Sequence, residues 1–173
     1  MRLGSFPISL SAVFFLLFLC TSAIIGQTNS RYVVFAGDEL EKIVPTSFYF
    51  AGLSAPTQMR NSAAARIGRD RYVLTGLVDT SGYSAEISGK YEGFFITDSP
   101  VTIGNRALNS GAYGFGFTKQ GQMRTFELNA RQMLSVTAPA DRQLERPRPL
   151  HMVAVRNGIR LYHGRNYVLI TPR

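Results

Sequence analysis

The sequence predicts an all-β fold, a single-domain antiparallel sandwich or barrel of about ten short strands with one or two short helical turns. Two observations carry this prediction. Residues 112–118 alternate with a period of two, which places Tyr113, Phe115 and Phe117 on one face of a strand. Elsewhere, short β-branched and aromatic runs are separated by glycine, proline and asparagine turns, and hardly any stretch has a helical period.

Residues 1–26 have the pattern of a signal peptide, and residues 27–173 then form a single domain. Arg2 provides a positive start, Ile8 to Leu19 is apolar apart from two serines, and we expect cleavage after Gly26. An uncleaved anchor is the less favoured alternative, since the apolar stretch is nearly long enough to cross a bilayer. We therefore expect a periplasmic or secreted protein of bacterial type, with no stable membrane span after cleavage.

The composition agrees with life outside the cytoplasm. Cys20 is the only cysteine and lies in the leader, so the exported part must be held together without disulfides. The chain carries a formal net charge of +8, scattered singly rather than in runs. Behind an export signal, this charge indicates solubility, or contact with an anionic envelope surface such as lipid head groups or acidic polysaccharide, and a solvated face is the favoured explanation. An anionic envelope surface or a protein partner is expected, and nucleic acid is not. The oligomeric state is left open.

The first elements are short. Residues 32–36 read as a strand, residues 38–44 as a single helical turn capped by Asp38, and residues 47–53 as a second strand. Residues 57–67 are ambiguous, because polar residues are followed by three alanines with helix propensity. The residues that the helical turn would bury are Leu40 and Ile43.

The next segments flank a polar interior stretch. Residues 71–78 are apolar on both faces, which predicts a strand in the middle of a sheet that is covered on both sides. Residues 79–90 are polar and allow one short helical turn that Gly89 closes. Residues 91–97 return to strand composition.

A hairpin forms the predicted centre of the fold. Residues 112–118 pair with residues 123–128 through a turn in which Gly121 takes a positive φ. The three aromatic rings of the first strand face the core, and the opposite, glycine-rich face is nearly bare. That face either packs against another element or admits a sugar ring or an acyl chain.

The C-terminal third contains a proline-rich loop and a second hairpin. After a strand at residues 131–136, residues 138–150 are expected to form a surface loop, because their prolines prevent regular pairing. Asn157-Gly158 predicts a two-residue turn that pairs Val155 with Arg160. This register places His151 and His163 on opposite faces, so we expect no metal site; no cofactor is expected either.

The leading functional hypothesis is an exported, non-enzymatic β domain that binds an envelope component, either an apolar or glycan ligand or a protein partner. Loops 79–91 and 138–150 are the candidate surface, since binding residues concentrate in loops on a rigid scaffold and tyrosine and arginine are common anchors. The candidate ligand-binding residues are Tyr83, Lys90, Arg146 and Arg148.

Two short stretches of the sequence resemble motifs of known protein families. The spacing of Ile103-Gly104, Leu108, Gly111, Tyr113 and Phe115 resembles a strand of secreted bacterial β-sandwich domains of the transthyretin (prealbumin) type, which implies fold class only.

Leu77-Val78-Asp79-Thr80 resembles the Asp-Thr-Gly strand of retroviral-type aspartic proteases, although Ser81 stands where that family has glycine. This resemblance implies an alternative function: a homodimeric hydrolase in which Asp79 and its symmetry mate share a proton.

Overall fold

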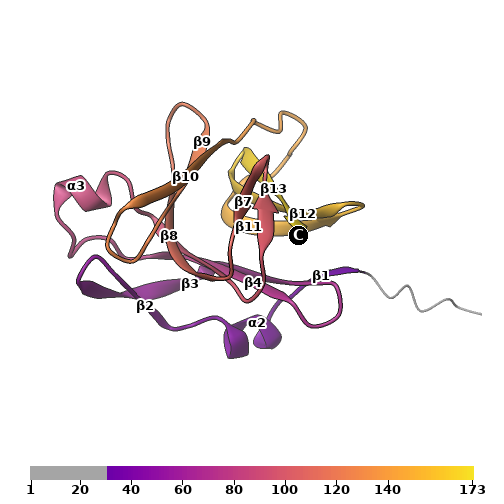
Figure 1. Cartoon of the computed structure of the whole chain (residues 1–173), viewed down its shortest axis with the longest axis horizontal. Helices are drawn as coiled ribbons and strands as arrows, with labels where there is room; N and C mark the ends of the chain where they lie inside the picture. The colour runs from indigo at the N-terminus through magenta and orange to yellow at the C-terminus, as the bar shows by residue number, and fades with distance from the viewer. Residues whose placement is uncertain (1–30) are drawn as a thin grey trace, which may run out of the picture.

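The computed structural model describes residues 31–173, and the predicted signal peptide lies outside them. Thirteen strands form two antiparallel sheets (Figure 1). The large sheet has the order β1-β3-β4-β5-β8-β9-β10, with β2 paired to β3, and the small sheet has the order β11-β12-β13-β6-β7. The strands of the large sheet are β1 (Tyr32–Val34), β2 (Ser47–Phe50), β3 (Leu53–Ile67), β4 (Tyr72–Val78), β5 (Gly93–Thr97), β8 (Gly111–Phe117), β9 (Gln122–Phe126) and β10 (Gln132–Thr137). Those of the small sheet are β6 (Val101–Ile103), β7 (Arg106–Leu108), β11 (Arg148–Val155), β12 (Gly158–Gly164) and β13 (Asn166–Pro172).

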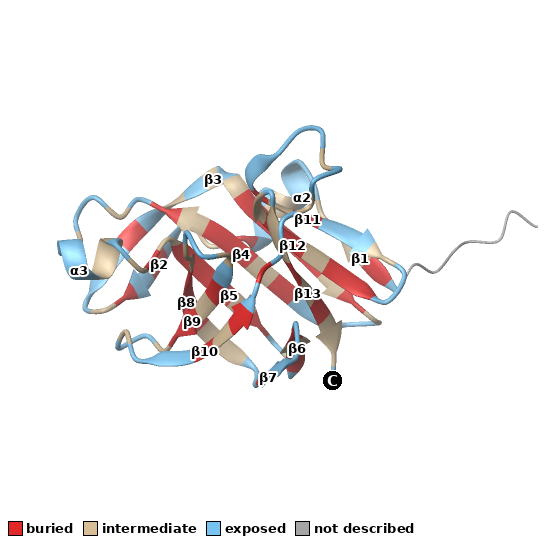
Figure 2. Ribbon diagram, turned by 90° about the horizontal axis from the view of Figure 1, so that it is seen from above, coloured by how far each residue is buried: buried red, intermediate tan, exposed pale blue. Residues whose placement is uncertain are grey.

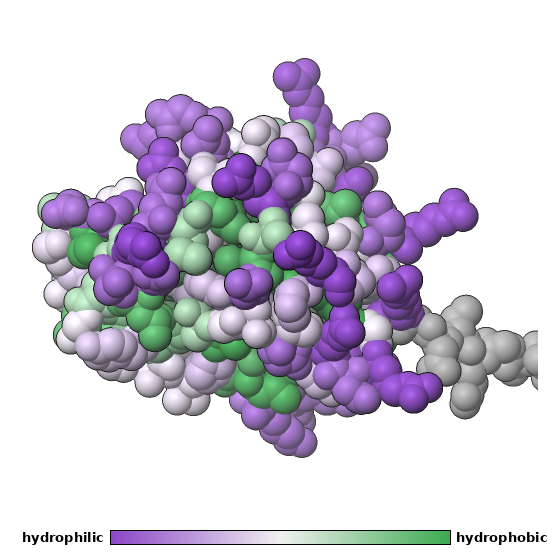
Figure 3. Space-filling model, in the orientation of Figure 1, coloured by the Kyte–Doolittle hydropathy of each residue, from purple (hydrophilic) through white to green (hydrophobic). Residues whose placement is uncertain are grey.

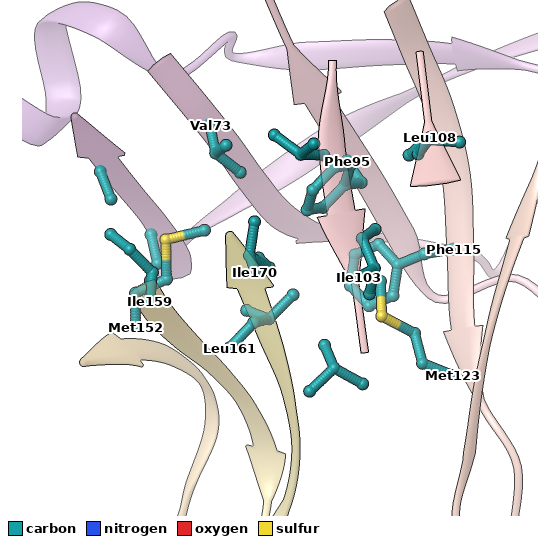
Figure 4. Packing of buried hydrophobic residues seen from close by; sticks show 14 of the residues in the cluster. Val73, Phe95, Ile103, Leu108, Phe115, Met123, Met152, Ile159, Leu161 and Ile170 are labelled. Carbon is teal, nitrogen blue, oxygen red and sulfur yellow. The ribbon is translucent and has the colours of Figure 1, made fainter. Parts of the chain in front are cut away.

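The two sheets face each other across the main core. Buried side chains from both sheets interdigitate there, and along the strands buried and more exposed residues alternate (Figures 2 and 4). We call this cluster the sandwich core; it includes Val73, Phe95, Ile103, Phe115, Met123, Ile159, Leu161 and Ile170. The all-β sandwich predicted from the sequence is therefore confirmed.

A second cluster covers the other face of the large sheet. The hairpin of β2 with the first part of β3 folds over that face, so Phe50 stacks on Tyr91 with ring centroids 4.0 Å apart, and Phe48 stacks on Phe94 at 5.0 Å. We call it the outer cluster; its buried members are Val44, Phe48, Phe50, Ala55, Ala64, Val78, Tyr91, Phe94 and Phe126.

The central hairpin forms as predicted. Tyr113 and Phe115 are buried in the sandwich core, Phe117 packs against it, and Gly121 has a φ of +72° in the turn between β8 and β9. The glycine face of β8 is covered, not open. A Cβ on Gly114 would lie 2.3 Å from Cε2 of Phe50, so only glycine lets that ring lie flat on the strand.

Strand β4 lies inside the sheet with both faces covered, as predicted. Val73 points into the sandwich core, whereas Leu74 and Val78 belong to the outer cluster. The ambiguous residues 57–67 are strand throughout, as part of the 15-residue β3. Pairing with β1 and β4 overrides the helix propensity of its alanines, and an irregularity between Thr57 and Ser62 lets β3 cross from the hairpin into the sheet.

Both short helical turns are present, with one correction. Helix α2 (Asp38–Ile43) begins after Gly37, whose position provides no side-chain cap, so the predicted capping by Asp38 is wrong. Leu40 packs on the outer cluster, but Ile43 is 36% exposed and does not turn inward. Helix α3 (Ala85–Ser88) is capped by the hydroxyl of Ser84, which accepts from the Ile87 amide, and ends at Gly89 as expected.

The C-terminal hairpin differs from its predicted register by two residues. Val155 pairs with Gly158, so Arg156 and Asn157 form the turn and Gly158 belongs to β12. The reason is the neighbouring strand: a Cβ on Gly158 would lie 2.3 Å from the carbonyl oxygen of Ile170. The glycine therefore serves close packing of β12 on β13 and not the turn.

The proline-rich loop is also shorter than predicted. Strand β11 begins at Arg148, which lies opposite Gly164, so the last three residues of the predicted loop 138–150 belong to this strand. Regular pairing resumes only at His151, and Pro149 sits in this irregular step, where the ladder does not need its missing N–H.

Candidate functional site

Loop 79–91 lies at one end of the large sheet. It connects the end of β4 to the start of β5, beside the turn that joins β8 to β9. Gly116 brings the two together, since a Cβ there would lie 2.1 Å from the carbonyl oxygen of Lys90. Close contact between β8 and the Lys90 backbone therefore fixes the end of the loop.

A cavity of about 420 Å³ opens between this loop and the β8–β9 turn, and we call it the cationic pocket. Three of its lining residues, Lys90, Lys119 and Arg124, carry positive charge, and Glu92 carries the one negative charge. Arg124 forms no ion pair with any other described residue, and its Nε atom is buried without a hydrogen-bond partner among them. The pocket therefore keeps a net positive charge.

The carboxylate of Glu92 is already engaged by the fold. Its Oε2 accepts a hydrogen bond of 2.7 Å from the amide of Phe117, and its Oε1 lies 3.6 Å from Nε2 of His163. The imidazole of His163 stacks on the Phe117 ring, with centroids 4.8 Å apart and planes 11° from parallel. Glu92 thus holds the ends of β8 and β12 together, and its single negative charge is outnumbered by the three cations of the cationic pocket.

Glu92 also lines a second cavity of about 300 Å³, which we call the His163 pocket. Its other polar residues can donate or accept hydrogen bonds through amide, hydroxyl and imidazole groups. They are Gln58, Thr80, Ser88, Tyr91 and His163. Among the described residues no hydrogen bond joins Ser88 to His163, so the pair is not arranged as an activated nucleophile with its base.

The two residues of the protease-like motif, Asp79 and Thr80, have different surroundings in the structure. Asp79 is exposed, and its Oδ1 accepts a hydrogen bond of 3.0 Å from the amide of Ser81. This bond lowers the pKa of Asp79. The geometry is that of a turn residue. Thr80, by contrast, lines the His163 pocket.

Of the two predicted anchors in loop 79–91, one is part of the outer cluster. Tyr83 packs edge-on against Phe50 and Tyr91, and its hydroxyl donates to the carbonyl of Leu53 at 2.9 Å. Its body and its polar tip are therefore both occupied by the fold. Lys90 lines the cationic pocket and forms an exposed ion pair of 3.1 Å with Glu86.

The two arginines from the proline-rich segment are exposed and line neither pocket. Arg148 lies opposite Gly164, the residue after His163, so the register brings its backbone to the same end of the molecule as loop 79–91. Arg146 precedes the strand. The structure thus unites Lys90 and Thr80 around Glu92 and leaves Arg146 and Arg148 outside the two pockets.

The histidines lie on opposite faces of β11 and β12, as predicted. His151 stacks on Tyr162 with centroids 4.7 Å apart, on the face away from the sandwich core. Burial, and then the positive charge of Arg148, lowers the pKa of His151. Within residues 31–173, no group of three or more histidine, cysteine or carboxylate side chains could hold a metal ion.

Sequence reasoning missed the residues that complete the two pockets: Glu92, Phe117, Lys119, Arg124 and His163. Two of them had a local signal, because Glu92 and Arg124 are charged residues inside runs of strand composition. Nothing local indicated that they would meet, since Glu92 directly precedes β5, Arg124 lies on β9, and β8 runs between these two strands.

No protein-family model, curated protein or solved structure matches this chain. In the part of the chain that the structure describes, no helix has the length and apolar character needed to cross a membrane. The function must therefore be argued from the geometry and charge of the pockets themselves.

Proposed function

We propose that this chain is an exported, non-enzymatic β domain that binds an acidic glycan of the cell envelope at the two pockets around Glu92. The observation that carries the proposal is the gathering of Lys90, Lys119 and Arg124 around one cavity of about 420 Å³ with a single, internally bonded carboxylate. Carboxylate or sulfate groups are the natural partners of such a site.

The second pocket supports a sugar in preference to a simple ion. It adjoins the first at Glu92 and is otherwise lined by amide, hydroxyl and imidazole groups that can exchange hydrogen bonds with sugar hydroxyls. The stacked pair of Phe117 and His163 joins the two pockets, because Phe117 lines the first and His163 lines the second. In a glycan that links an acidic sugar to a neutral one, the acidic sugar would occupy the cationic pocket and the neutral sugar the His163 pocket.

The test is the binding of oligogalacturonate to the folded domain, measured by isothermal titration calorimetry, with neutral dextran as the control ligand. A triple variant, Lys90→Gln, Lys119→Gln and Arg124→Gln, should weaken binding about tenfold or more, because each charge-assisted hydrogen bond contributes roughly 1.5–3 kcal/mol. A matched triple variant with the same charge change, Arg66→Gln, Arg69→Gln and Arg71→Gln, should bind as the parent does.

Two results would refute the proposal. Equal losses in both triple variants would mean that the ligand responds to net charge alone. Binding of dextran as tight as that of oligogalacturonate would remove the role of the cations. Both variants should keep the parent circular dichroism spectrum, since the substituted side chains lie outside the two buried clusters.

A further inference from the structure

A second cationic surface lies at the other end of the sandwich. It consists of the turn between β3 and β4 together with the end of β13. Loop 79–91 lies at the opposite ends of β4 and β5, next to Val78 and Gly93, one strand length away. Figure 1 shows α3 and the start of β1 at opposite ends of the molecule. We call this surface the arginine end; its basic residues are Arg31, Arg66, Arg69, Arg71 and Arg173.

The arginines are held close together by the local fold. Arg31, Arg69 and Arg71 line a cavity of about 420 Å³ with Gly68 and Pro172. Nη1 of Arg66 donates to the carbonyl of Arg69 at 3.1 Å, and Nη1 of Arg71 reaches the carbonyl of Arg173 at 3.4 Å. Strongly hydrophilic side chains project from this end in the space-filling view (Figure 3).

Their charge is not neutralised by the fold. No ion pair within 4.0 Å joins any of the five arginines to an aspartate or glutamate side chain of the described residues. The nearby acids are Asp70, which lines the cavity, and Asp98, whose Oδ2 accepts from the Tyr72 amide at 2.9 Å. Five guanidinium groups against the two side-chain carboxylates leave a net positive charge on one end of a small domain.

An exposed aromatic side chain indicates the kind of anionic partner. The ring of Tyr72 is 36% exposed beside Arg71 and stacks on Phe35 with centroids 6.0 Å apart. A half-exposed tyrosine among arginines is typical of surfaces at a membrane–water interface.

We infer that the arginine end docks on the surface of a bilayer that contains anionic phospholipid. Arginines close to such a surface each strengthen binding about fivefold, so five of them give useful affinity without any inserted segment. The docked domain would point the Glu92 pockets away from the bilayer. The inference uses residues separate from those pockets and stands without the proposed function.

The test uses residues 27–173, which contain every described strand and both buried clusters and lack the apolar run. Vesicles of phosphatidylcholine alone, or of phosphatidylcholine and phosphatidylglycerol in equal parts, are sedimented with the protein. We expect retention on the anionic vesicles only, and a fall as salt is added, because screening weakens exposed charges.

Substitution locates the binding surface. The triple variant Arg66→Gln, Arg69→Gln and Arg71→Gln should lose about a hundredfold in vesicle affinity. The triple variant Lys90→Gln, Lys119→Gln and Arg124→Gln, with the same charge change at the opposite end, should bind vesicles as the parent does.

Equal losses in the two variants, or unchanged binding of the arginine variant, would overturn the inference. So would equal retention on neutral vesicles. Because oligogalacturonate binding is measured on the same two variants, failure of either idea is seen separately from failure of the other.

Discussion

Gly114 and Phe50 provide the sharpest test of how the outer cluster is built. A Cβ at Gly114 would lie 2.3, 2.8 and 2.9 Å from three atoms of the Phe50 ring, and that ring is fully buried against Tyr91. Because the ring has nowhere to move, we expect Gly114→Ala to destabilise the protein by about 1–3 kcal/mol through overpacking. Phe50→Ala should cost about 3–5 kcal/mol through the cavity it leaves.

The two changes should not add. Once the ring is gone, the methyl group of Gly114→Ala has room, and its cost should vanish or become a small gain, since alanine is favoured over glycine in a strand by about 0.5–1 kcal/mol. Urea unfolding followed by circular dichroism and tyrosine fluorescence measures all four proteins, as the chain has no tryptophan. Gly82→Ala, whose Cβ would meet only the flexible end of Leu53, is the control. Costs that add to within about 0.5 kcal/mol would refute the contact.

Three smaller effects are expected elsewhere. The lowered pKa of His151 means that between this pKa and the ordinary 6.5 the folded protein binds fewer protons than the unfolded chain, so stability should fall as pH drops below about 6.5. His151→Gln should flatten that slope in urea unfolding at several pH values, and an unchanged slope would contradict the assignment. The buried hydroxyl of Thr75 donates to the carbonyl of Phe94 at 2.7 Å, so Thr75→Val should cost about 1 kcal/mol in the same assay, and no loss would mean that the bond contributes nothing. Glu86→Gln removes the exposed pair with Lys90 and should change stability by at most about 0.5 kcal/mol in thermal melts; a larger loss would show that the pair orders loop 79–91.

The strands that could be predicted are those with a strong local pattern. The alternation around Phe115 and the double apolar face of Val73 and Leu74 both follow from side chains that alternate along a strand, and both are confirmed. The register at Gly158 could not be predicted, because the close approach of β13 requires glycine at this position, and the turn beside it does not. In the same way the alanines of β3 take the conformation that their neighbours impose.

The residues of the candidate site also fall into those that local sequence could indicate and those that it could not. Thr80 could be singled out only through the resemblance to the protease strand. Lys90 could be singled out because it belongs to the polar segment between two strands, where binding residues concentrate. Tyr83 has the same local character, yet its ring and hydroxyl are used by the outer cluster. Whether a loop tyrosine faces solvent or the interior depends on the surface beneath it, and here that surface is Phe50 from a different hairpin.

By itself, the sequence determines that this chain is built of strands around Tyr113 and Phe115. Successive side chains of a strand point to opposite faces, so apolar residues at every second position reveal the strand. The tertiary structure alone decides that Glu92, Arg124 and His163 meet at one end of the sandwich and that the arginines gather at the other. Those residues lie on different strands, and contact between them depends on sheet order and register, which arise from packing over the whole domain and leave no mark in any short stretch of sequence.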